Sequence, residues 1–389
     1  MNKKIIVSNK ILVGENLELK DNIAIVIKDD KIEELVDKDK ILDYENYEVI
    51  DYGDMVVMPG LIDCHNHLAL DARLENHLIK MTDPEFNHIM RALKTMKDDL
   101  YSGITSSRYM GDKYYIDVKF RNEQNSGNIL GPRIYCCGIG MRSLHGHGYV
   151  GEAFVGVDEF RRQSRMNISK GVDFLKIFAT GVIRDKDFIP NFLTDAEIRC
   201  VVEEAKSVGI PTAVHVSGGR ALDQCIDNGV DVFEHVYYID EEQIDKINDS
   251  NRWVTFTPSY AMDDELLFKF SKNTKERTLY EKDLIMKSLS KAIEKGINFG
   301  IGTDGLHTNI ATEAKYISEL GASNLDIVKG ITSNAAKIMR KENVGSIDKN
   351  KLADLVVLKE NPLENINALQ NIEHVVFGGQ LIRWYKFVE

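Results

Sequence analysis

Eight short apolar runs, each followed by a helix-length amphipathic segment, constrain the fold of this chain more than any other feature. The runs lie at residues 56–64, 104–108, 133–137, 173–178, 211–215, 231–235, 253–257 and 298–303. Strands that alternate with helices form parallel sheets, because each helix carries the chain back across the sheet. We therefore predict an α/β fold, and the eight strand–helix units predict a (β/α)8 TIM barrel.

The two ends of the chain carry strand patterns without intervening helices. β-branched runs lie at residues 5–7, 11–13 and 23–27, and further apolar runs lie at 353–358 and 374–384. Such runs, broken by Gly, Asn and Asp, are typical of a small sheet. We predict a small β-sandwich domain formed by residues 1–55 and 345–389, beside a barrel domain formed by residues 56–344.

One predicted helix has well-marked ends. Residues 195–208 carry apolar side chains at helical spacing, Thr194 stands at the N-cap position, and Gly209 follows the last turn. Threonine N-caps and C-terminal glycines are typical helix boundaries. The stretch 258–297 is charged and helical in pattern, and we interpret it as a lid or an extra helix.

The composition narrows the class of protein. The 389 residues have a net charge of −12 and no stripe of Lys and Arg with interleaved aromatics, so we expect no nucleic-acid partner. No run approaches the about 18 apolar residues of a membrane span, and the N-terminus lacks a signal-peptide pattern. The five cysteines show no C-x-x-C spacing, which is typical of reduced thiols in a cytoplasmic protein.

The first predicted barrel strand ends in a His-x-His motif. Residues 58–67 read Met-Pro-Gly-Leu-Ile-Asp-Cys-His-Asn-His, so an apolar run leads to His65 and His67. Residues i and i+2 of a strand point to the same side, which allows both imidazoles to bind one metal ion. Cys64 has the opposite parity, and we expect it in the core. Two histidines at this spacing also occur by chance, so the motif alone leaves a metal site open.

Four further polar residues stand at or near the ends of later strands. They are Lys176, His215, His235 and Asp304, on the fourth, fifth, sixth and eighth strands. The reacting groups of a (β/α)8 barrel lie at the carboxyl ends of its strands, so we expect all six residues at one mouth. Imidazoles and a carboxylate form a ligand set that suits Zn²⁺ or a similar ion.

Each of these residues also has an ordinary structural role open to it. A histidine after a strand is often a satisfied polar residue, and Asp304, which lies between glycines, is the kind of residue that caps a turn. Lys176 lies in a buried apolar strand, where an ion pair or a snorkelling side chain would explain it. In the functional interpretation Asp304 binds metal and holds the proton of an attacking water.

Residues on the predicted strand–helix loops are candidates for contact with a substrate. We name His145 and His147 in a glycine-flanked loop, Tyr237 and Tyr238 after the sixth strand, and His307 after the eighth. Packing, or a plain flexible loop, explains them equally well. Substrate choice is expected on the loops at 68–80, 141–150, 182–191, 237–240 and 305–310.

Taken together these motifs resemble the amidohydrolase superfamily from end to end. Residues 58–67 resemble its opening strand, and residues 171–176, 213–215, 234–235 and 302–304 resemble its later metal motifs in order and spacing. The stretches 332–336 and 345–357 resemble its C-terminal signature. Residues 174–181, His147-Gly148 and the single histidine after the sixth strand are most similar to the imidazolonepropionase-like group, which includes metal-dependent Xaa-Pro (prolidase-like) dipeptidases.

The resemblance implies a ligand set and a chemistry. Lys176 would be carbamylated by CO₂ and would bridge two divalent metal ions, zinc being the first choice. His65, His67 and Asp304 would hold one ion, and His215 and His235 the other. Members of the superfamily form homo-oligomers, so we expect one here.

Two positions depart from the dipeptidase-like pattern. That group usually has a tyrosine at the position of Ser217 and a second glycine at the position of Val182. The serine hydroxyl is shorter and is a weaker donor at that reach, so Tyr237 or Tyr238 would have to replace the missing phenol.

The function that we predict is hydrolysis of an amide or other C–N bond, in a dipeptide of the Xaa-Pro kind or an N-acyl amino acid. Metal would activate the water, and Asp304 would act as general base and then general acid. Two alternatives stay open: a mononuclear deaminase or cyclic-amide hydrolase of the imidazolonepropionase kind, and a catalytically inactive barrel scaffold.

Overall fold

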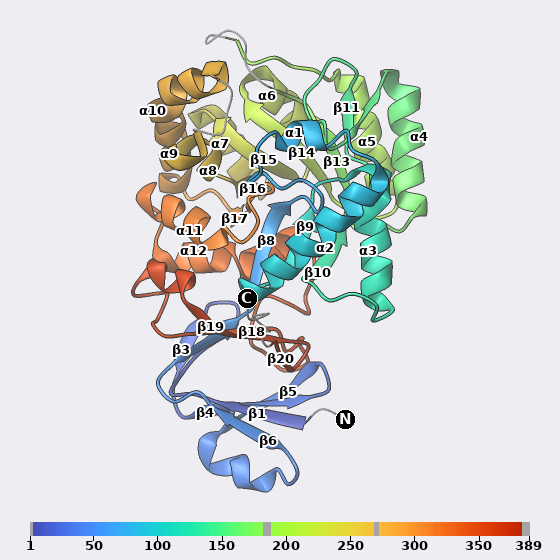
Figure 1. Cartoon of the computed structure of the whole chain (residues 1–389). Helices are drawn as coiled ribbons and strands as arrows, with labels where there is room; N and C mark the ends of the chain where they lie inside the picture. Colours follow the sequence, from blue (N-terminus) through green and yellow to red (C-terminus); the bar gives the residue numbers. More distant parts are fainter. Residues whose placement is uncertain (1–2, 182–187, 268–271, 383–389) are drawn as a thin grey trace.

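The N-terminal strands and the C-terminal strands lie together in the smaller, lower part of the molecule (Figure 1). The computed structural model describes residues 3–181, 188–267 and 272–382. The N-terminal segment supplies β1 (Lys3–Val7), β2 (Lys10–Val13), β3 (Glu18–Lys20), β4 (Ile23–Lys28), β5 (Lys31–Asp37) and β6 (Glu48–Asp51), with the 3-10 helix η1 (Lys38–Asp43). The C-terminal segment supplies β18 (Leu355–Leu358), the 3-10 helix η3 (Ile366–Gln370), β19 (Ile372–Phe377) and β20 (Gln380–Ile382).

These strands form two sheets. One has the order β5-β4-β1-β6, and the other has the order β20-β19-β18-β7-β2-β3. One hydrophobic cluster draws side chains from both sheets, among them Ile6 and Ile25 from the first and Ile11, Val57 and Leu355 from the second. The two sheets are therefore packed together through a common core, and segments far apart in the sequence share one of them.

The apolar run at 56–64, predicted as one strand, is two strands in different sheets. β7 (Val56–Pro59) pairs with β18 and β2 in the small part, whereas β8 (Leu61–Asn66) pairs with β9. Gly60 stands between them, and a Cβ atom there would lie 2.2 Å from Oγ1 of Thr105. The expectation of one continuous strand was wrong, because the two halves of the run pair with strands of different sheets.

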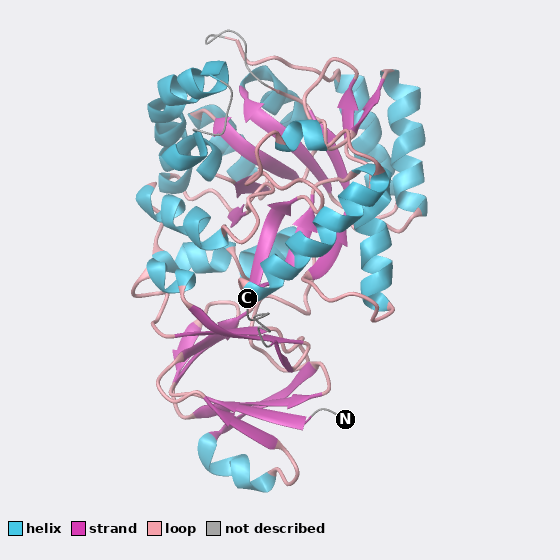
Figure 2. Ribbon diagram, viewed as in Figure 1, coloured by secondary structure: helices cyan, strands magenta, loops and turns pink. Residues whose placement is uncertain are grey.

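The larger part of the molecule contains parallel strands surrounded by helices (Figure 2). One sheet has the order β10-β9-β8 and the other the order β12-β11-β13-β14-β15-β16-β17. Their strands are β9 (Ile104–Tyr109), β10 (Arg133–Cys136), β11 (Met141–Ser143), β12 (Glu152–Phe154), β13 (Leu175–Phe178), β14 (Thr212–Gly218), β15 (Val232–Tyr238), β16 (Trp253–Phe256) and β17 (Phe299–Ile301). The short strands β11 and β12 were not predicted, because they lie in a stretch without a long apolar run.

The α/β fold with parallel strands is confirmed, but the described strands do not form one closed ladder. The two parallel sheets are separate between β10 and β13 and between β17 and β8. At the second gap the carboxylate of Asp63 on β8 accepts hydrogen bonds from the backbone N–H and the hydroxyl of Thr303, which follows β17. A side chain thus replaces ladder hydrogen bonds at the place where the sequence predicted closure.

Helices cover the outside of the parallel strands (Figure 2). They are α1 (His77–Lys80), α2 (Glu85–Tyr101), the 3-10 helix η2 (Lys113–Tyr115), α3 (Ile116–Asn125), α4 (Gly156–Ser169), α5 (Asp195–Ser207), α6 (Gly219–Asp227), α7 (Glu241–Asp249), α8 (Ser259–Met262), α9 (Asp264–Leu267), α10 (Lys272–Glu294), α11 (Ile310–Glu319), α12 (Asn324–Gly330) and α13 (Ser333–Ile338). The largest hydrophobic cluster, with fully buried Phe233, Phe256 and Leu289, joins strands and helices.

Two helix predictions are confirmed. α5 begins after Thr194, whose side chain accepts the N–H of Glu197 while the Glu197 side chain accepts the N–H of Thr194, a capping box. The stretch 258–297 is helical where the structure describes it, in α8, α9 and α10; residues 268–271 lie outside the described residues. In the described part of the chain, none of the helices is long and apolar enough to cross a membrane.

Candidate metal centre

The six residues named from the sequence lie on five strands or directly after them. His65 is in β8, Lys176 in β13, His215 in β14 and His235 in β15. His67 follows β8, and Asp304 follows β17. The side chains of His65, His67, Lys176 and His235 are each at most 3% exposed, and that of Asp304 is 20% exposed. Buried polar groups of this kind need partners, so the geometry around each decides its role.

His65, His67 and Asp304 converge on one point. Oδ1 of Asp304 lies 3.3 Å from Nε2 of His65 and 3.5 Å from Nε2 of His67. The backbone reinforces the arrangement, because the N–H of Asp304 donates to the carbonyl of His65 at 2.7 Å. Two imidazole nitrogens and one carboxylate oxygen therefore face a common position from two neighbouring strands.

His235 and His215 extend the cluster along the sheet. The ring centroid of His235 lies 4.6 Å from that of His65 and 4.5 Å from that of His215. One ligand atom each from His65, His235 and Asp304 lies within 4.8 Å of the other two. One divalent ion would fit among these three atoms, and His67 and His215 flank the same position.

The outer nitrogens of three of these histidines are hydrogen-bonded. Nδ1 of His65 lies 2.8 Å from Oε2 of Glu234, Nδ1 of His67 lies 2.8 Å from the carbonyl of Gly111, and Nδ1 of His235 lies 2.7 Å from Oγ1 of Thr257. The oxygens of Glu234 and Gly111 can only accept, which fixes the tautomer of His65 and His67 in which Nδ1 carries the proton. Nε2 of these two histidines then keeps a free lone pair, which is the arrangement seen around metal-binding histidines.

Glu234 belongs to a buried ion pair that sequence reasoning missed. Its Oε1 accepts a hydrogen bond from Nη1 of Arg108 at 2.8 Å, and both side chains are at most 1% exposed. The Arg108 guanidinium also lies over the ring of Phe174, 4.4 Å from its centroid. Burial would raise the pKa of Glu234, but Arg108 and His65 hold it far below its usual value. A buried arginine in the strand 104–109 was the available signal.

Asp63 is a second missed residue. One carboxylate oxygen accepts the N–H of His65 at 3.0 Å and that of Thr303 at 3.1 Å, and the other accepts the Thr303 hydroxyl at 2.6 Å. Gly302 fits beside it because a Cβ atom there would lie 2.5 Å from the backbone nitrogen of His65. Asp63 therefore fixes the distance between the two strands that carry His65 and Asp304.

Asp304 has an unusual backbone that a tyrosine supports. Its φ angle is +52°, in the left-handed region that non-glycine residues rarely adopt. The hydroxyl of Tyr260 donates to the Asp304 carbonyl at 2.8 Å. Tyr260 lies on α8, in the stretch that the sequence predicted to be a lid, and here it contacts the backbone of a candidate ligand.

Lys176 is a buried amine that lacks a hydrogen-bond partner among the described residues. It is 0% exposed, and its Nζ lies 5.1 Å from the centroid of the Phe178 ring. Burial lowers the pKa of Lys176 to about 8, partly offset by the carboxylate of Glu234. An amine that is neither solvated nor hydrogen-bonded is costly to keep. The orphaned nitrogen fits a group that is added to it or binds beside it.

The electrostatics of the remaining ligands suit a cation. Burial lowers the pKa of His215 and His235 well below the usual value, so both rings are neutral at pH 7, the form that binds metals. Burial alone would raise the pKa of Asp304, but His65 and His67 hold it well below its usual value. The donor set of neutral imidazoles and an ionised carboxylate fits a divalent transition metal ion such as zinc.

One residue of the predicted substrate loop lies beside the cluster. The ring centroid of His147 is 4.9 Å from that of His215, and burial lowers the pKa of His147. His145 is exposed instead, with its ring edge against Phe192 at 5.3 Å. The structure thus brings one of these two histidines to the cluster and leaves the other outside it.

The other three substrate candidates have their polar atoms engaged within the protein. The Tyr237 hydroxyl lies 3.0 Å from both oxygens of Thr257, and that of Tyr238 donates to Glu281 at 2.6 Å. Both ring nitrogens of His307 are occupied, by Asp99 at 2.8 Å and by the carbonyl of Leu70 at 2.9 Å.

The loop at 182–191 is described only in part. Val182, the position of the second departure from the dipeptidase pattern, lies outside the described residues, as does the rest of 182–187. Ser217, the first departure, is hydrogen-bonded to Thr180, with 3.1 Å between the two hydroxyls.

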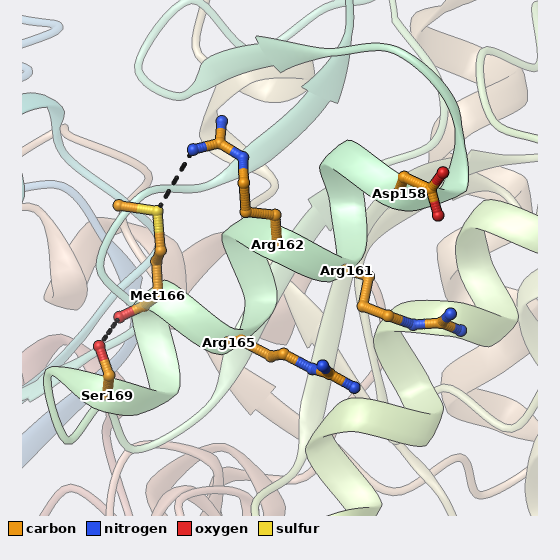
Figure 3. A pocket seen from close by; sticks show the side chains of 6 residues that line it. All are labelled: Asp158, Arg161, Arg162, Arg165, Met166 and Ser169. Atoms are coloured by element: carbon orange, nitrogen blue, oxygen red, sulfur yellow. Dashed lines mark hydrogen bonds between the residues drawn. The ribbon is translucent and has the colours of Figure 1, made fainter.

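A surface hollow of about 430 Å³ lies away from these histidines, on helix α4 (Figure 3). It is lined by Asp158, Arg161, Arg162, Arg165, Met166 and Ser169. Arg161 and Arg165 both bind Glu204 on α5. Since all six lining residues come from one helix and two of the cations are already paired, the hollow provides no converging groups for chemistry.

Comparison with known proteins identifies the family. The sequence pattern of the amidohydrolase family matches residues 56–382, so the chain belongs to the amidohydrolase family and is a hydrolase by class. This match confirms the resemblance that the sequence motifs carried.

Particular relatives refine the likeness. Ochratoxinase of Aspergillus niger is 29% identical over 370 residues, which cover 84% of this chain and 76% of the relative. Imidazolonepropionase of Clostridium tetani is 23% identical over 390 residues, covering 88% and 86%. A solved Xaa-Pro dipeptidase with methionine bound in its active site superposes with a TM-score of 0.85 at 26% identity, covering 98% of this chain and 100% of the other.

Proposed function

We propose that this protein is a binuclear metal-dependent hydrolase that cleaves an amide C–N bond. The observation that carries the proposal is the buried amine of Lys176, which has no hydrogen-bond partner among the described residues and lies on β13, the strand paired with the β14 strand that carries His215. In the proposal His65, His67 and Asp304 would hold one ion, and His215 and His235 would hold the second. A carbamate on Lys176 would supply oxygen ligands to the pair.

Carbamylation would complete the environment of Lys176. The unprotonated amine attacks the carbon of CO₂: a C–N bond forms, one C=O π bond of CO₂ opens, and one amine proton is released, so that an anionic carbamate replaces the neutral amine. A carbamate carries two oxygen atoms that can bind metal, whereas the unmodified lysine side chain has no oxygen. Burial, which favours the neutral amine, supports this step.

In the proposed hydrolysis the metal ions and the protein side chains have different roles. A pair of divalent ions, zinc in the first instance, supplies Lewis-acid activation of water and of the scissile carbonyl when bound. Asp304 accepts the proton of the attacking water on its carboxylate and passes it to the leaving nitrogen. His65 and His67 lower the pKa of Asp304 against the effect of burial, and the side chain is therefore an ionised carboxylate with a lone pair for that proton.

Apolar side chains packed next to the cluster support a substrate with an apolar side chain. The ring of Phe178 lies 5.8 Å from that of His215 and belongs to a buried cluster with Leu70, Met81 and Val150. We propose a dipeptide of the Xaa-Pro kind or an N-acyl amino acid. The name of the related Xaa-Pro dipeptidase supports the dipeptide class. His147 is the residue we assign to contact with the substrate.

A second candidate is a mononuclear deaminase or cyclic-amide hydrolase. His65, His235 and Asp304 are sufficient for one ion, since one ligand atom from each lies within 4.8 Å of the others. The related imidazolonepropionase gives this alternative its support. An inactive scaffold is the least favoured candidate, because the donors converge and their outer nitrogens are held.

Metal content per chain tests the proposal and separates the candidates. The protein is purified with bicarbonate and analysed for metals beside a Lys176→Ala variant, with Lys206→Ala on the surface helix α5 as the matched control. We expect two ions per chain, lost to one or none in Lys176→Ala and unchanged in the control, with short carboxylic acids restoring part of the loss. One ion in both the wild type and Lys176→Ala contradicts the binuclear proposal and favours the second candidate.

We also propose the finer architecture and the location that the sequence predicted. The N–H of Asp304 to the carbonyl of His65, and the N–H of Asp173 to the carbonyl of Cys136, bridge the two gaps between the parallel sheets and support a closed (β/α)8 barrel. The shared cluster of the two smaller sheets supports a β-sandwich, with the domain limits given above. The five cysteines, all buried free thiols, support a cytoplasmic location.

A further inference from the structure

The imidazole of His307 has a hydrogen-bond acceptor at each of its two ring nitrogens. Nδ1 lies 2.8 Å from Oδ2 of Asp99 on α2, and Nε2 lies 2.9 Å from the carbonyl oxygen of Leu70, in the loop after β8. A carbonyl oxygen can only accept, so Nε2 carries a proton. A neutral imidazole has a single N–H group, which Leu70 already uses. The form of the Asp99 side chain therefore decides whether Nδ1 carries a second proton.

The surroundings of Asp99 favour its ionised form. Its Oδ1 accepts the N–H of Thr308 at 2.8 Å, and its Oδ2 accepts the side-chain amide of Asn66 at 3.2 Å. That amide is oriented by its own oxygen, which accepts the N–H of His67 at 2.8 Å. A carboxylate that accepts several N–H groups is stabilised as the anion. His307 therefore faces an anion at Nδ1, and both of its nitrogens carry protons.

The charged groups around His307 are compatible with a cation at this position. Asp99 and His307 are both fully buried. Asp71 and Arg73, in the loop after β8, also act on the ring, but they form an ion pair with each other at 2.8 Å. Asp112, after β9, is a further buried carboxyl group that interacts with His307. Burial alone would lower the pKa of His307, but the carboxylate of Asp99 raises it above its usual value.

His88 shows what burial does to a histidine of this protein that lacks such a partner. It is fully buried and lies on α2, the helix that carries Asp99. Burial, and after it the cations of Arg91 and Lys113, lower the pKa of His88 to about 4. The two histidines are equally buried and have opposite neighbours, so His88 is a matched control for His307.

The hydrogen bond from His307 to Leu70 connects the segments that follow two candidate metal ligands. Leu70 is three residues after His67, and His307 is three residues after Asp304. Two N–H groups on one rigid ring, held by acceptors on both sides, fix the ring and the backbone that it bonds. The side chain of His307 is thus placed to keep the two segments at a constant separation.

We propose that His307 is an imidazolium cation and a positioning residue, which together with Asp99 holds the segment after His67 against the segment after Asp304. The cation supplies one N–H donor to each acceptor, whereas a neutral ring would turn a lone pair toward one of them. The charge of His307 follows from its own contacts, and its effect on metal binding rests on the function proposed above.

The charge is tested by nitrogen NMR of the metal-free protein with isotope-labelled histidine, assigned with the variants His307→Gln and His88→Gln. An ordinary histidine is half titrated at a pH of about 6.5. At that pH we expect the ring of His307 to keep both protons and the ring of His88 to carry one. Asp99→Asn should move the titration midpoint of His307 below the usual value, because burial is then uncompensated. A wild-type His307 ring with one proton at that pH overturns the proposal.

The positioning role is tested by hydrogen exchange of the metal-free protein, analysed by mass spectrometry. Glutamine is uncharged and donates from one nitrogen only, so in His307→Gln the amides of residues 68–73 and 304–308 should exchange at least about tenfold faster. His307→Lys keeps the charge and should recover part of the loss, and His88→Gln should leave both segments unchanged. Unchanged exchange in His307→Gln, or an equal change in His88→Gln, overturns the role. If His307→Gln fails to fold, Asp99→Asn, which keeps the shape of the side chain, is measured in its place.

Zinc affinity connects the positioning role to the metal centre. Competition with a chromophoric chelator should give an affinity about tenfold lower in His307→Gln than in the wild type and in His88→Gln. Faster exchange of the two segments with an unchanged affinity overturns the role in metal binding. A wild-type protein that binds no zinc overturns the proposed function instead, and hydrogen exchange then decides the role of His307 by itself.

Discussion

The carboxylate of Glu234 holds the imidazole of His65 from behind, with 2.8 Å between Oε2 and Nδ1. The two residues come from β15 and β8, and both are buried. Because Nδ1 faces an anion, it carries the proton, and Nε2 faces Asp304 with its lone pair free. The orientation of one candidate ligand is thus set by a residue on a strand across the site, next in sequence to another candidate ligand, His235.

Glu234→Gln should weaken metal binding. An amide is a weaker acceptor for Nδ1 of His65 and leaves Arg108 without its anion, so we expect affinity for zinc to fall about 10- to 100-fold. Competition with a chromophoric chelator measures this affinity. Glu313→Gln is the matched control, because Glu313 is an equally buried glutamate whose Oε2 accepts the N–H of Ser259 instead of holding a histidine of the cluster. Equal affinities in the two variants would contradict the role assigned to Glu234.

Arg108→Met should destabilise the fold. Removing one partner of a buried ion pair leaves the other charge uncompensated, which costs about 3 to 5 kcal/mol. We expect a loss of that size in the free energy of unfolding of the metal-free protein, measured by urea denaturation. The double variant Arg108→Met with Glu234→Gln should lose less than Arg108→Met alone. A double variant that loses more than the single one would mean that Arg108 acts mainly through its packing on Phe174.

The sequence predicted those residues of the site whose placement depends only on their position within one strand. His65 and His67 could be named because alternate residues of a strand share one side, and His235 and Asp304 because barrel ligands follow strand ends. These rules need only the position of a residue within its own strand. The structure brings these four side chains together.

The supporting residues could not be named in this way. Glu234 and Arg108 meet across strands that are distant in the sequence, and no local pattern tells a buried ion pair from two surface charges. The break at Gly60 was missed for a related reason, since it depends on pairing with strands of two different sheets. His307 looked like a rim residue from its place after Asp304, yet Asp99 on α2 and the carbonyl of Leu70 occupy both of its nitrogens.

Tyr260→Phe should loosen the backbone of Asp304 without removing a ligand. The lost hydroxyl donates to the carbonyl of Asp304, whose φ angle of +52° needs support. We expect zinc affinity to fall about tenfold, toward the lower end of the range for groups that position ligands. Isothermal titration of the metal-free protein measures it, with Tyr316→Phe on α11 as control. A Tyr260→Phe variant with the wild-type affinity would show that Asp304 is held by its own backbone hydrogen bond to His65.

Glu313→Gln should change how stability depends on pH. Glu313 is buried, its Oε2 accepts the N–H of Ser259 at 3.0 Å, and its Oε1 has no partner among the described residues. Burial therefore raises its pKa in the folded state well above 4.5, while the unfolded chain keeps a value near 4.5.

Above pH 4.5 the unfolded state releases a proton that the folded state retains, so Glu313 makes the free energy of unfolding fall as pH rises. Glutamine cannot titrate. The free energy of unfolding of the variant should thus be close to that of the wild type at pH 4 and should exceed it increasingly as the pH rises above 4.5, in urea denaturation at each pH. A difference between the two proteins that is constant over this range would mean that Glu313 is ionised in the folded protein.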